Sequence, residues 1–311
     1  MRAPEPEILP VNTPQAASGR LPLLVLLSLF CVYVIWGSTY LAIRFALEAY
    51  PPLFFPGLRF VVAGSVLMLA LRLRGAPLPT LRQFGCSAAI GFLLLNVGNG
   101  AVVYAQQSVG SALAATVVAT MPLWASLFGG IWGQWPRKMQ WIGLVVGFSG
   151  ILLLNIGGDF AANPLSAALL VTASVSWAFG SVWSRRIDLP KGAMSTACQM
   201  LSAGLLFLLA SWWRGESWQL VTTPRATAAL AYLAVFGSII AFSAYIYLVQ
   251  TVSPQLATSY AYVNPVIALL FGVGLGGELF VASELAAMAL VLFGVLLIVR
   301  YNRPLPARPP A

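Results

Sequence analysis

The residues best suited to bind a small molecule in this chain are uncharged amides and aromatic rings. Asn96 and Asn99 lie three residues apart, and Tyr260 and Asn264 lie four apart, so on α-helices each pair shares a face. A buried amide offers donors and an acceptor, which cannot be left unpaired in lipid. Each pair therefore either lines a wet cavity that binds a substrate ammonium or carboxylate, or joins two helices by hydrogen bonds.

Four aromatic residues extend this set of substrate-binding candidates. Trp36 and Trp177 lie deep inside apolar stretches, whereas a tryptophan that anchors a membrane interface lies at an end. Such rings either form an aromatic wall around a solute or fill the interior of a helix bundle. Tyr104 and Tyr245 are weaker candidates for the same wall.

Two prolines, Pro122 and Pro265, interrupt apolar stretches, and Thr116 lies six residues before the first of them. A proline inside a helix leaves the carbonyl four residues earlier without its amide partner; for Pro122 this is the carbonyl of Val118. The freed carbonyl either accepts from a substrate ammonium or is satisfied by a neighbouring Ser or Thr at a kink. We predict kinked gate helices next to a site that includes Thr116.

The composition limits what these residues can be part of. Of 311 residues, 59% are apolar and only 8% are charged, and there is no histidine. A soluble globule would need far more charge, and zinc, Ser-His-Asp and Cys-His enzymes need an imidazole. The net charge of +9 is spread between apolar stretches, which argues against a nucleic-acid partner. We expect an all-α polytopic protein in a lipid bilayer, with no cofactor and no metal.

Ten apolar runs, most of them near 20 residues, are long enough to cross a hydrocarbon core of about 30 Å. The predicted spans are Leu21–Ile43, Leu53–Leu71, Phe84–Gln106, Ser111–Trp132, Met139–Ile156, Pro164–Ser184, Met194–Trp213, Ala226–Val249, Gln255–Gly276 and Ala282–Val299.

The basic residues orient these spans, because short cytoplasmic loops are rich in Lys and Arg. With the N-terminus inside, the inner segments hold 13 basic residues and the outer segments hold 3, namely Arg44, Arg214 and Arg225. Both termini are therefore predicted to be cytoplasmic. Residues 1–20 and the proline-rich residues 301–311 are predicted to be tails, the first disordered. The first apolar run is interpreted as a retained helix, since it is too long for a signal-peptide core, and the three cysteines as packing residues.

The two halves of the chain, residues 21–156 and 164–300, resemble each other. Trp36 precedes Arg44 by eight residues, as Trp177 precedes Arg185. From the third span on, matched residues share an offset of 143: Tyr104 with Tyr247, Gln107 with Gln250, Leu113 with Leu256, Pro122 with Pro265 and Gly129 with Gly272. Five spans are an odd number, so the second half enters the membrane inverted. Inverted repeats are typical of secondary carriers, whose site lies where the halves meet.

The order of these motifs resembles the EamA-type family of the drug/metabolite transporter superfamily. The resemblance covers roughly Leu21 to Val299 and rests on Trp36-Gly37-Ser38, Arg44, Pro51, Arg59, Tyr104, Pro122, Pro265, Gly277-Glu278 and Glu284. Gln134, the repeat counterpart of Glu278, departs from the pattern, because many family members carry an acid there. The resemblance is greatest to bacterial exporters of aromatic and other neutral amino acids, and it implies an inner-membrane location and export.

The charged residues bear on the mechanism. The acids lie in tails or near span ends and are interpreted as solvated loop residues. Arg59 is the one basic residue well inside a span, and either pairs with a substrate carboxylate or, as we expect, snorkels to the interface or bonds to helix-end carbonyls. Gly143 and Gly147 are interpreted as a close helix contact.

We therefore predict a carrier, not an enzyme, that exports small amphipathic metabolites, in particular neutral or aromatic amino acids. It would work by alternating access and facilitatively, and a single copy would suffice. The alternatives are a proton-coupled exporter of other drugs or metabolites, a membrane-embedded enzyme and a passive channel.

Overall fold

The computed structural model describes residues 22–133, 135–136, 138–154, 163–218, 223–252, 259–279 and 281–300. Within these ranges the chain is helical, with no strand, as the sequence predicts. Helices pair their backbone groups locally, which suits a chain that must leave no peptide group unpaired in lipid. The predicted terminal tails lie outside the described residues.

The helices of the first half follow the predicted spans. The first run is continuous through a π-helical segment, the third contains another, and the fourth is broken into two helices. The bounds are α1 Leu23–Phe30, η1 Cys31–Trp36, α2 Gly37–Leu47, α3 Phe54–Leu73, α4 Leu81–Gly91, η2 Phe92–Asn99, α5 Gly100–Ala105, α6 Ser111–Val118, α7 Met121–Ile131 and α8 Lys138–Leu154.

Among the described residues of the second half, the third span contains a π-helical segment, and the first and fourth spans are unbroken α-helices. The bounds are α10 Pro164–Ser184, α11 Ala193–Trp213, α12 Pro224–Tyr232, η3 Leu233–Ile240, α13 Ala241–Thr251, α15 Tyr260–Gly276 and α16 Ala282–Arg300. The beginning of the predicted ninth span, residues 255–258, lies outside the described residues.

Among the residues that the structure describes, seven helical segments are long and apolar enough to cross a membrane, and three shorter apolar helices lie at Lys138–Leu153, Val263–Gly276 and Ala282–Leu297. Together they coincide with the ten predicted spans. The number of crossings and the side of the termini remain predictions, because helix length and composition alone do not decide them.

The helix ends follow local signals in the sequence. Thr80 and Gln83 form a capping box at the start of α4: each backbone N–H donates to the other side chain, at 3.2 Å. At the end of α15, Gly277 has φ of 63°, a left-handed conformation that suits glycine. This turn directs Glu278 back over the helix, where its N–H donates to the carbonyl of Gly272 at 3.0 Å.

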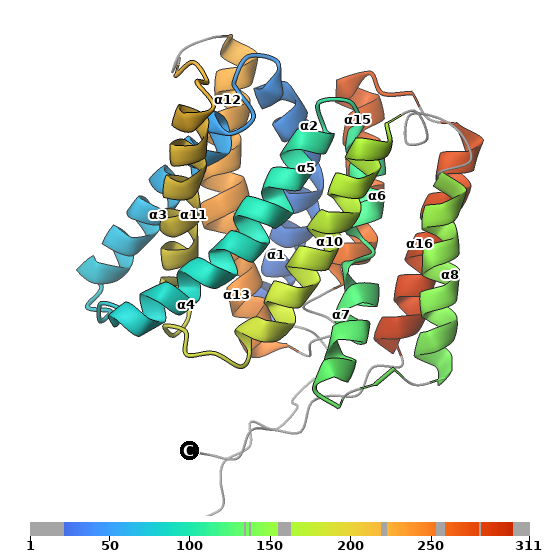
Figure 1. Ribbon diagram of the computed structural model, residues 1–311, viewed down its shortest axis with the longest axis horizontal. Coiled ribbons are helices and arrows are strands. Elements are labelled where there is room, and N and C mark those ends of the chain that lie inside the picture. The colour runs from blue at the N-terminus through green and yellow to red at the C-terminus, as the bar shows by residue number, and fades with distance from the viewer. Residues whose placement is uncertain are drawn as a thin grey trace, which may run out of the picture.

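The helices form one bundle in which both halves are in contact (Figure 1). The helix pair α8 and α16 lies at one side, and α3 packs along α11 at the opposite side. Gly294 of α16 meets Gly143 and Gly147 so closely that an added Cβ would lie 2.5 Å from the nitrogen of Gly147. The close packing predicted from the two glycines of α8 is therefore confirmed.

The exterior of the bundle is apolar. Large side chains such as Leu73, Leu165 and Trp213 are 72–82% exposed. A soluble protein would bury such residues, so this surface suits hydrocarbon.

Candidate substrate-binding site

A cavity lies inside the bundle, lined by residues of η1, α2, α3, η2, α5, α6 and α7 from the first half and of α10, α13 and α15 from the second. The empty space at this site, its open part included, is about 850 Å³. Most lining residues are apolar or aromatic. Five of the nine predicted substrate-binding residues line it: Trp36, Asn99, Trp177, Tyr260 and Asn264.

Trp36 is held in place at the wall of the cavity by an aromatic cluster. Its ring centroid lies 5.1 Å from those of Phe242, Tyr245 and Tyr260. Its indole N–H donates to the carbonyl of Gly237 at 3.1 Å, in the π-helical segment η3. Because both its ring and its polar group have partners in the second half, Trp36 is a rigid wall element.

Trp177 faces the same cavity from α10 and is half-buried. It packs against η2 at Gly98, where an added Cβ would lie 3.1 Å from its ring. The two repeat-related tryptophans therefore both line the cavity, as the aromatic-wall hypothesis requires, and one is contributed by each half.

Two amides bring polar groups into the apolar cavity. Asn264 lines it from α15, and its Nδ2 lies 3.2 Å from the carbonyls of Tyr260 and Tyr33 when the amide is oriented to donate to both. Asn99 lines it from η2, and its buried Oδ1 has no hydrogen-bond partner among the described residues. The cavity thus offers hydrogen-bonding capacity that a bound solute would use.

Asn96 does not share the cavity with Asn99, and the predicted common face is wrong. Both residues lie in η2, a π-helix, whose wider turn separates positions three apart in the sequence. The Nδ2 of Asn96 donates to the carbonyl of Ala203 in α11 at 3.0 Å, and Asn96 does not belong to the cavity lining. This contact is the interhelical hydrogen bond that the sequence left open.

Three other predicted residues also lie outside the lining. Tyr245 lies behind the wall, with its ring on Trp36 and 5.8 Å from that of Tyr260. Thr116 is buried and donates to the carbonyl of Ala112 within its own helix at 2.8 Å. Tyr104 is half-buried at the end of α5.

The two predicted kink prolines differ in their surroundings. Pro122 stands in the first turn of α7, after a break between α6 and α7, whereas Pro265 lies inside the continuous helix α15. At the break, the hydroxyls of Thr120 and Ser174 donate to the carbonyl of Val117, at 2.6 and 3.0 Å. Neighbouring hydroxyls therefore do satisfy a carbonyl at this break.

Arg59 lies inside the bundle, so the expectation that it snorkels to the interface is wrong. It is 4% exposed and lines the cavity from α3. Its Nε donates to the hydroxyl of Ser238 at 2.8 Å. Its side chain points from α3 into the bundle, toward Ser238 and Gly237 of η3, which its position near the predicted boundary did not reveal.

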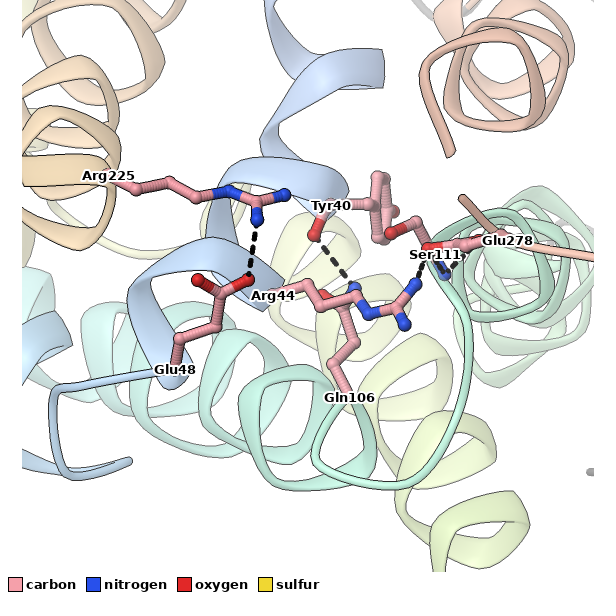
Figure 2. A network of polar contacts seen from close by, with 7 residues as sticks. All are labelled: Tyr40, Arg44, Glu48, Gln106, Ser111, Arg225 and Glu278. Atoms are coloured by element: carbon pink, nitrogen blue, oxygen red, sulfur yellow. Dashed lines mark hydrogen bonds and ion pairs between the residues drawn. The ribbon is translucent and has the colours of Figure 1, made fainter. Parts of the chain in front are cut away.

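Glu278 is likewise not a solvated loop residue. Its side chain is 4% exposed and pairs with Arg44 at 2.8 Å. Both of its oxygens also accept from the backbone N–H of Ser111, at 2.9 Å, at the start of α6 (Figure 2). A carboxylate at a helix N-terminus is favoured by the helix dipole. One side chain thus joins α2, α6 and the end of α15.

Two further contacts hold the same end of the bundle (Figure 2). Gln106 donates from Nε2 to the carbonyl of Tyr40 at 2.9 Å, which links α5 to α2. Arg225 lies 3.5 Å from Glu48 in a half-exposed ion pair between α12 and the end of α2. Sequence reasoning missed these contacts because each joins segments far apart in the chain.

Comparison with known proteins agrees with this arrangement. The model of the EamA-like transporter family matches the chain twice, at residues 23–156 and 164–300. The chain belongs to the EamA-like transporter family. Inner membrane transporter YedA of Escherichia coli is 48% identical over 91% of this chain and 92% of its own. Transporter YvbV of Bacillus subtilis is 25% identical over 85% of this chain and 88% of its own.

A solved structure supports the fold alone. It is a crystal structure of a protein 22% identical in sequence, and the match covers 88% of this chain and 96% of that one, with a TM-score of 0.65. The protein is thus a multi-pass transporter of the inner membrane, which confirms the family, the class of function and the location predicted from the sequence. Family and relatives indicate a transporter, not an enzyme.

Proposed function

We propose that this transporter exports small amphipathic metabolites, in particular neutral and aromatic amino acids, by alternating access around the cavity. The observation that carries the proposal is the cavity itself, whose wall combines Trp36 and Trp177 with the amides of Asn99 and Asn264. Aromatic and apolar surface suits an apolar side chain, and a few polar groups suit the polar end of the solute.

The proposed architecture is ten membrane crossings in two inverted five-helix halves, with both termini in the cytoplasm. The two family matches, one per half, support the repeat. Contacts between loops support the alternation of sides. Arg44 with Glu278 joins two predicted outer segments, and Gln83 with Asp188, at 3.3 Å, joins two predicted inner ones. In such carriers the substrate site lies between the halves.

The prolines support a place for the substrate ammonium. Pro265, inside α15, deprives the carbonyl of Ala261 of its helical partner, and Val118 ends α6 four residues before Pro122; both Val118 and Ala261 line the cavity. They share the repeat offset of 143, so each half supplies one acceptor. Pro122 and Pro265 would then act as the hinges of the moving helices.

We further propose that transport is facilitative. None of the described residues that line the cavity is an acid, and a proton-coupled carrier usually titrates a carboxylate there. The test is efflux of labelled phenylalanine from proteoliposomes, with counterflow to separate a carrier from a pore. We expect saturable efflux with counterflow and little response to an imposed pH gradient. An absolute requirement for that gradient would contradict facilitation.

The aromatic wall has its own test in the same vesicles. Trp36→Ala and Trp177→Ala should each reduce transport of phenylalanine about tenfold or more, because a stacked aromatic contact is lost. Trp213→Ala, which changes an 82%-exposed tryptophan on the outside of α11, is the matched control. Unchanged transport in both cavity variants would remove the wall from the proposal.

A further inference from the structure

We infer that Arg59 binds the carboxylate of the transported solute, so that a free carboxylate is a requirement for tight binding. This inference deepens the proposed function and rests on it, since it assigns the acidic group of the solute to a defined place in the cavity. It begins from the hydrogen-bond state of the Arg59 guanidinium.

The guanidinium is buried but only partly satisfied. Its Nε donates to Ser238, while its Nη1 is buried with no hydrogen-bond partner among the described residues. A guanidinium carries five N–H donors and keeps its proton at any physiological pH. An unmet donor on a permanent cation inside an apolar bundle is energetically costly, which indicates that a partner is missing.

The described acids are engaged elsewhere. Glu278 pairs with Arg44, and Glu48 pairs with Arg225. Glu216 accepts from the backbone N–H groups at the start of α3, Asp188 from Gln83, and Glu284 from the N–H of Val281. The countercharge of Arg59 is therefore not supplied by any acid that the structure describes.

The surroundings of Arg59 hold the group in a fixed position beside the cavity. Ser238 in turn donates to the carbonyl of Leu233, five residues earlier in the π-helix, at 3.1 Å. The guanidinium also lies over the ring of Phe60, 4.8 Å from its centroid. An added Cβ at Gly237 would lie 3.1 Å from Nη2, so a glycine there keeps room for the group.

A carboxylate is the ligand that fits best. Its two oxygens match the planar fork of N–H groups, and the charge-assisted pair is stronger than a neutral hydrogen bond. Because Arg59 lines the cavity along with Trp36 and Asn264, a solute held there can place a carboxylate on it and an apolar side chain on the tryptophan.

The experiment compares three solutes of one shape in the full-length protein reconstituted in liposomes: phenylalanine, its amide and phenethylamine. We expect the wild type to prefer phenylalanine over both by about tenfold or more, the worth of a charged hydrogen bond. Arg59→Met should lose this preference, and Arg59→Lys should keep part of it. Arg72→Met, at the exposed end of the same helix, should behave as the wild type.

A binding measurement keeps the two proposals distinguishable. Millimolar 3-phenylpropionate, which has the carboxylate but no amine, should raise the melting temperature of the wild type and not that of Arg59→Met. Equal concentrations of chloride or phosphate should raise neither, which separates an organic carboxylate from a simple anion.

The outcomes separate as follows. Transport of all three solutes at equal rates, or an acid preference that survives in Arg59→Met, overturns the role of Arg59 and leaves the export proposal standing. If no solute moves but 3-phenylpropionate stabilises only proteins with Arg59, the export proposal fails and the carboxylate site stands. Should Arg59→Met not fold, the preference of the wild type for phenylalanine over the two solutes without a carboxylate decides. If the wild type lacks this preference, the inference is refuted.

Discussion

The two ends of the bundle are held together in different ways. At one end, which we call the Glu278 end, a buried carboxylate joins Arg44 and Ser111, and Arg225 pairs with Glu48. At the other, the Asp188 end, the described contacts include an exposed hydrogen bond from Gln83 to Asp188 and the guanidinium of Arg186 over the ring of Trp132. The repeat makes this difference sharper, because the counterpart of Glu278 is the uncharged Gln134.

The two halves of the sequence are similar, but the two ends of the helix bundle are held together by different contacts. The hydrogen bonds of a carboxylate as buried as that of Glu278 are strengthened by its burial, although Arg44 is 42% exposed, whereas pairs with both side chains exposed contribute little. A carrier that alternates must open and close its two ends in turn. We therefore expect the structure to represent a state closed at the Glu278 end, which is the predicted outer side.

The largest expected effect is that of Glu278→Gln. Loss of the charge weakens the bonds to Arg44 and to the N-terminus of α6 by about 1.5–3 kcal/mol, so this end should open. The measurement is labelling of Ile43→Cys, a cavity-lining position of α2, by an impermeant maleimide in a background that lacks the three native cysteines. Labelling should rise several-fold.

The matched control for Glu278→Gln is Arg225→Gln. It removes an ion pair of the same end whose two side chains are 53% and 42% exposed, and should change stability by less than about 1 kcal/mol and labelling not at all. If the two variants label alike, burial of the charge is not what closes this end.

A smaller effect is expected for Glu216→Gln. The Glu216 side chain stabilises the same end of the bundle but does not belong to the network of Glu278. The carboxylate of Glu216 accepts from the backbone N–H of Phe54 at 2.9 Å and from the hydroxyl of Ser211 at 2.8 Å. Its loss should lower the free energy of unfolding by about 1 kcal/mol, which is measured as a lower melting temperature. The KM for phenylalanine should be unchanged. A shift in KM with no change in melting would contradict a purely structural role.

The smallest effect is expected at the opposite end, for Asp188→Asn. The hydrogen bond it accepts from Gln83 is exposed and 3.3 Å long, so its removal should cost less than about 0.5 kcal/mol. Melting temperature and transport rate should both match those of the wild type. A loss of stability or transport as large as that of Glu278→Gln would show that the two ends are held equally strongly, and would contradict the proposed difference between them.

Much of the fold follows from patterns that act over short distances. The apolar runs predicted the helices, and Gly143 and Gly147 predicted a close contact that α16 then supplies through Gly294. In the site, Trp36, Asn99, Trp177, Tyr260 and Asn264 were chosen by type and depth, and they line one cavity. Depth in a span is readable from sequence because the thickness of the membrane sets the length of each helix.

The errors share one physical cause, since each depends on what lies beside a residue in space. Asn96 was placed with Asn99 on the assumption of α-helical spacing, which the π-helix η2 does not keep. Arg59 was expected to reach the interface, and Glu278 to be solvated, yet both are buried by helices distant in sequence. No local pattern signalled these neighbours.

The sequence by itself determined the class of this protein: an apolar, histidine-free chain of two similar halves, related to transporters, with aromatic and amide residues at mid-depth. Those properties can be read from the types of residues and their spacing along the chain, without knowledge of contacts between distant segments. The tertiary structure alone decided that Arg59 stands in the cavity with a donor unmet and that Glu278 joins α2, α6 and α15 at one end. Burial and charge pairing are properties of neighbours, and the side-chain hydrogen-bond partners described for both residues come from the opposite half of the chain.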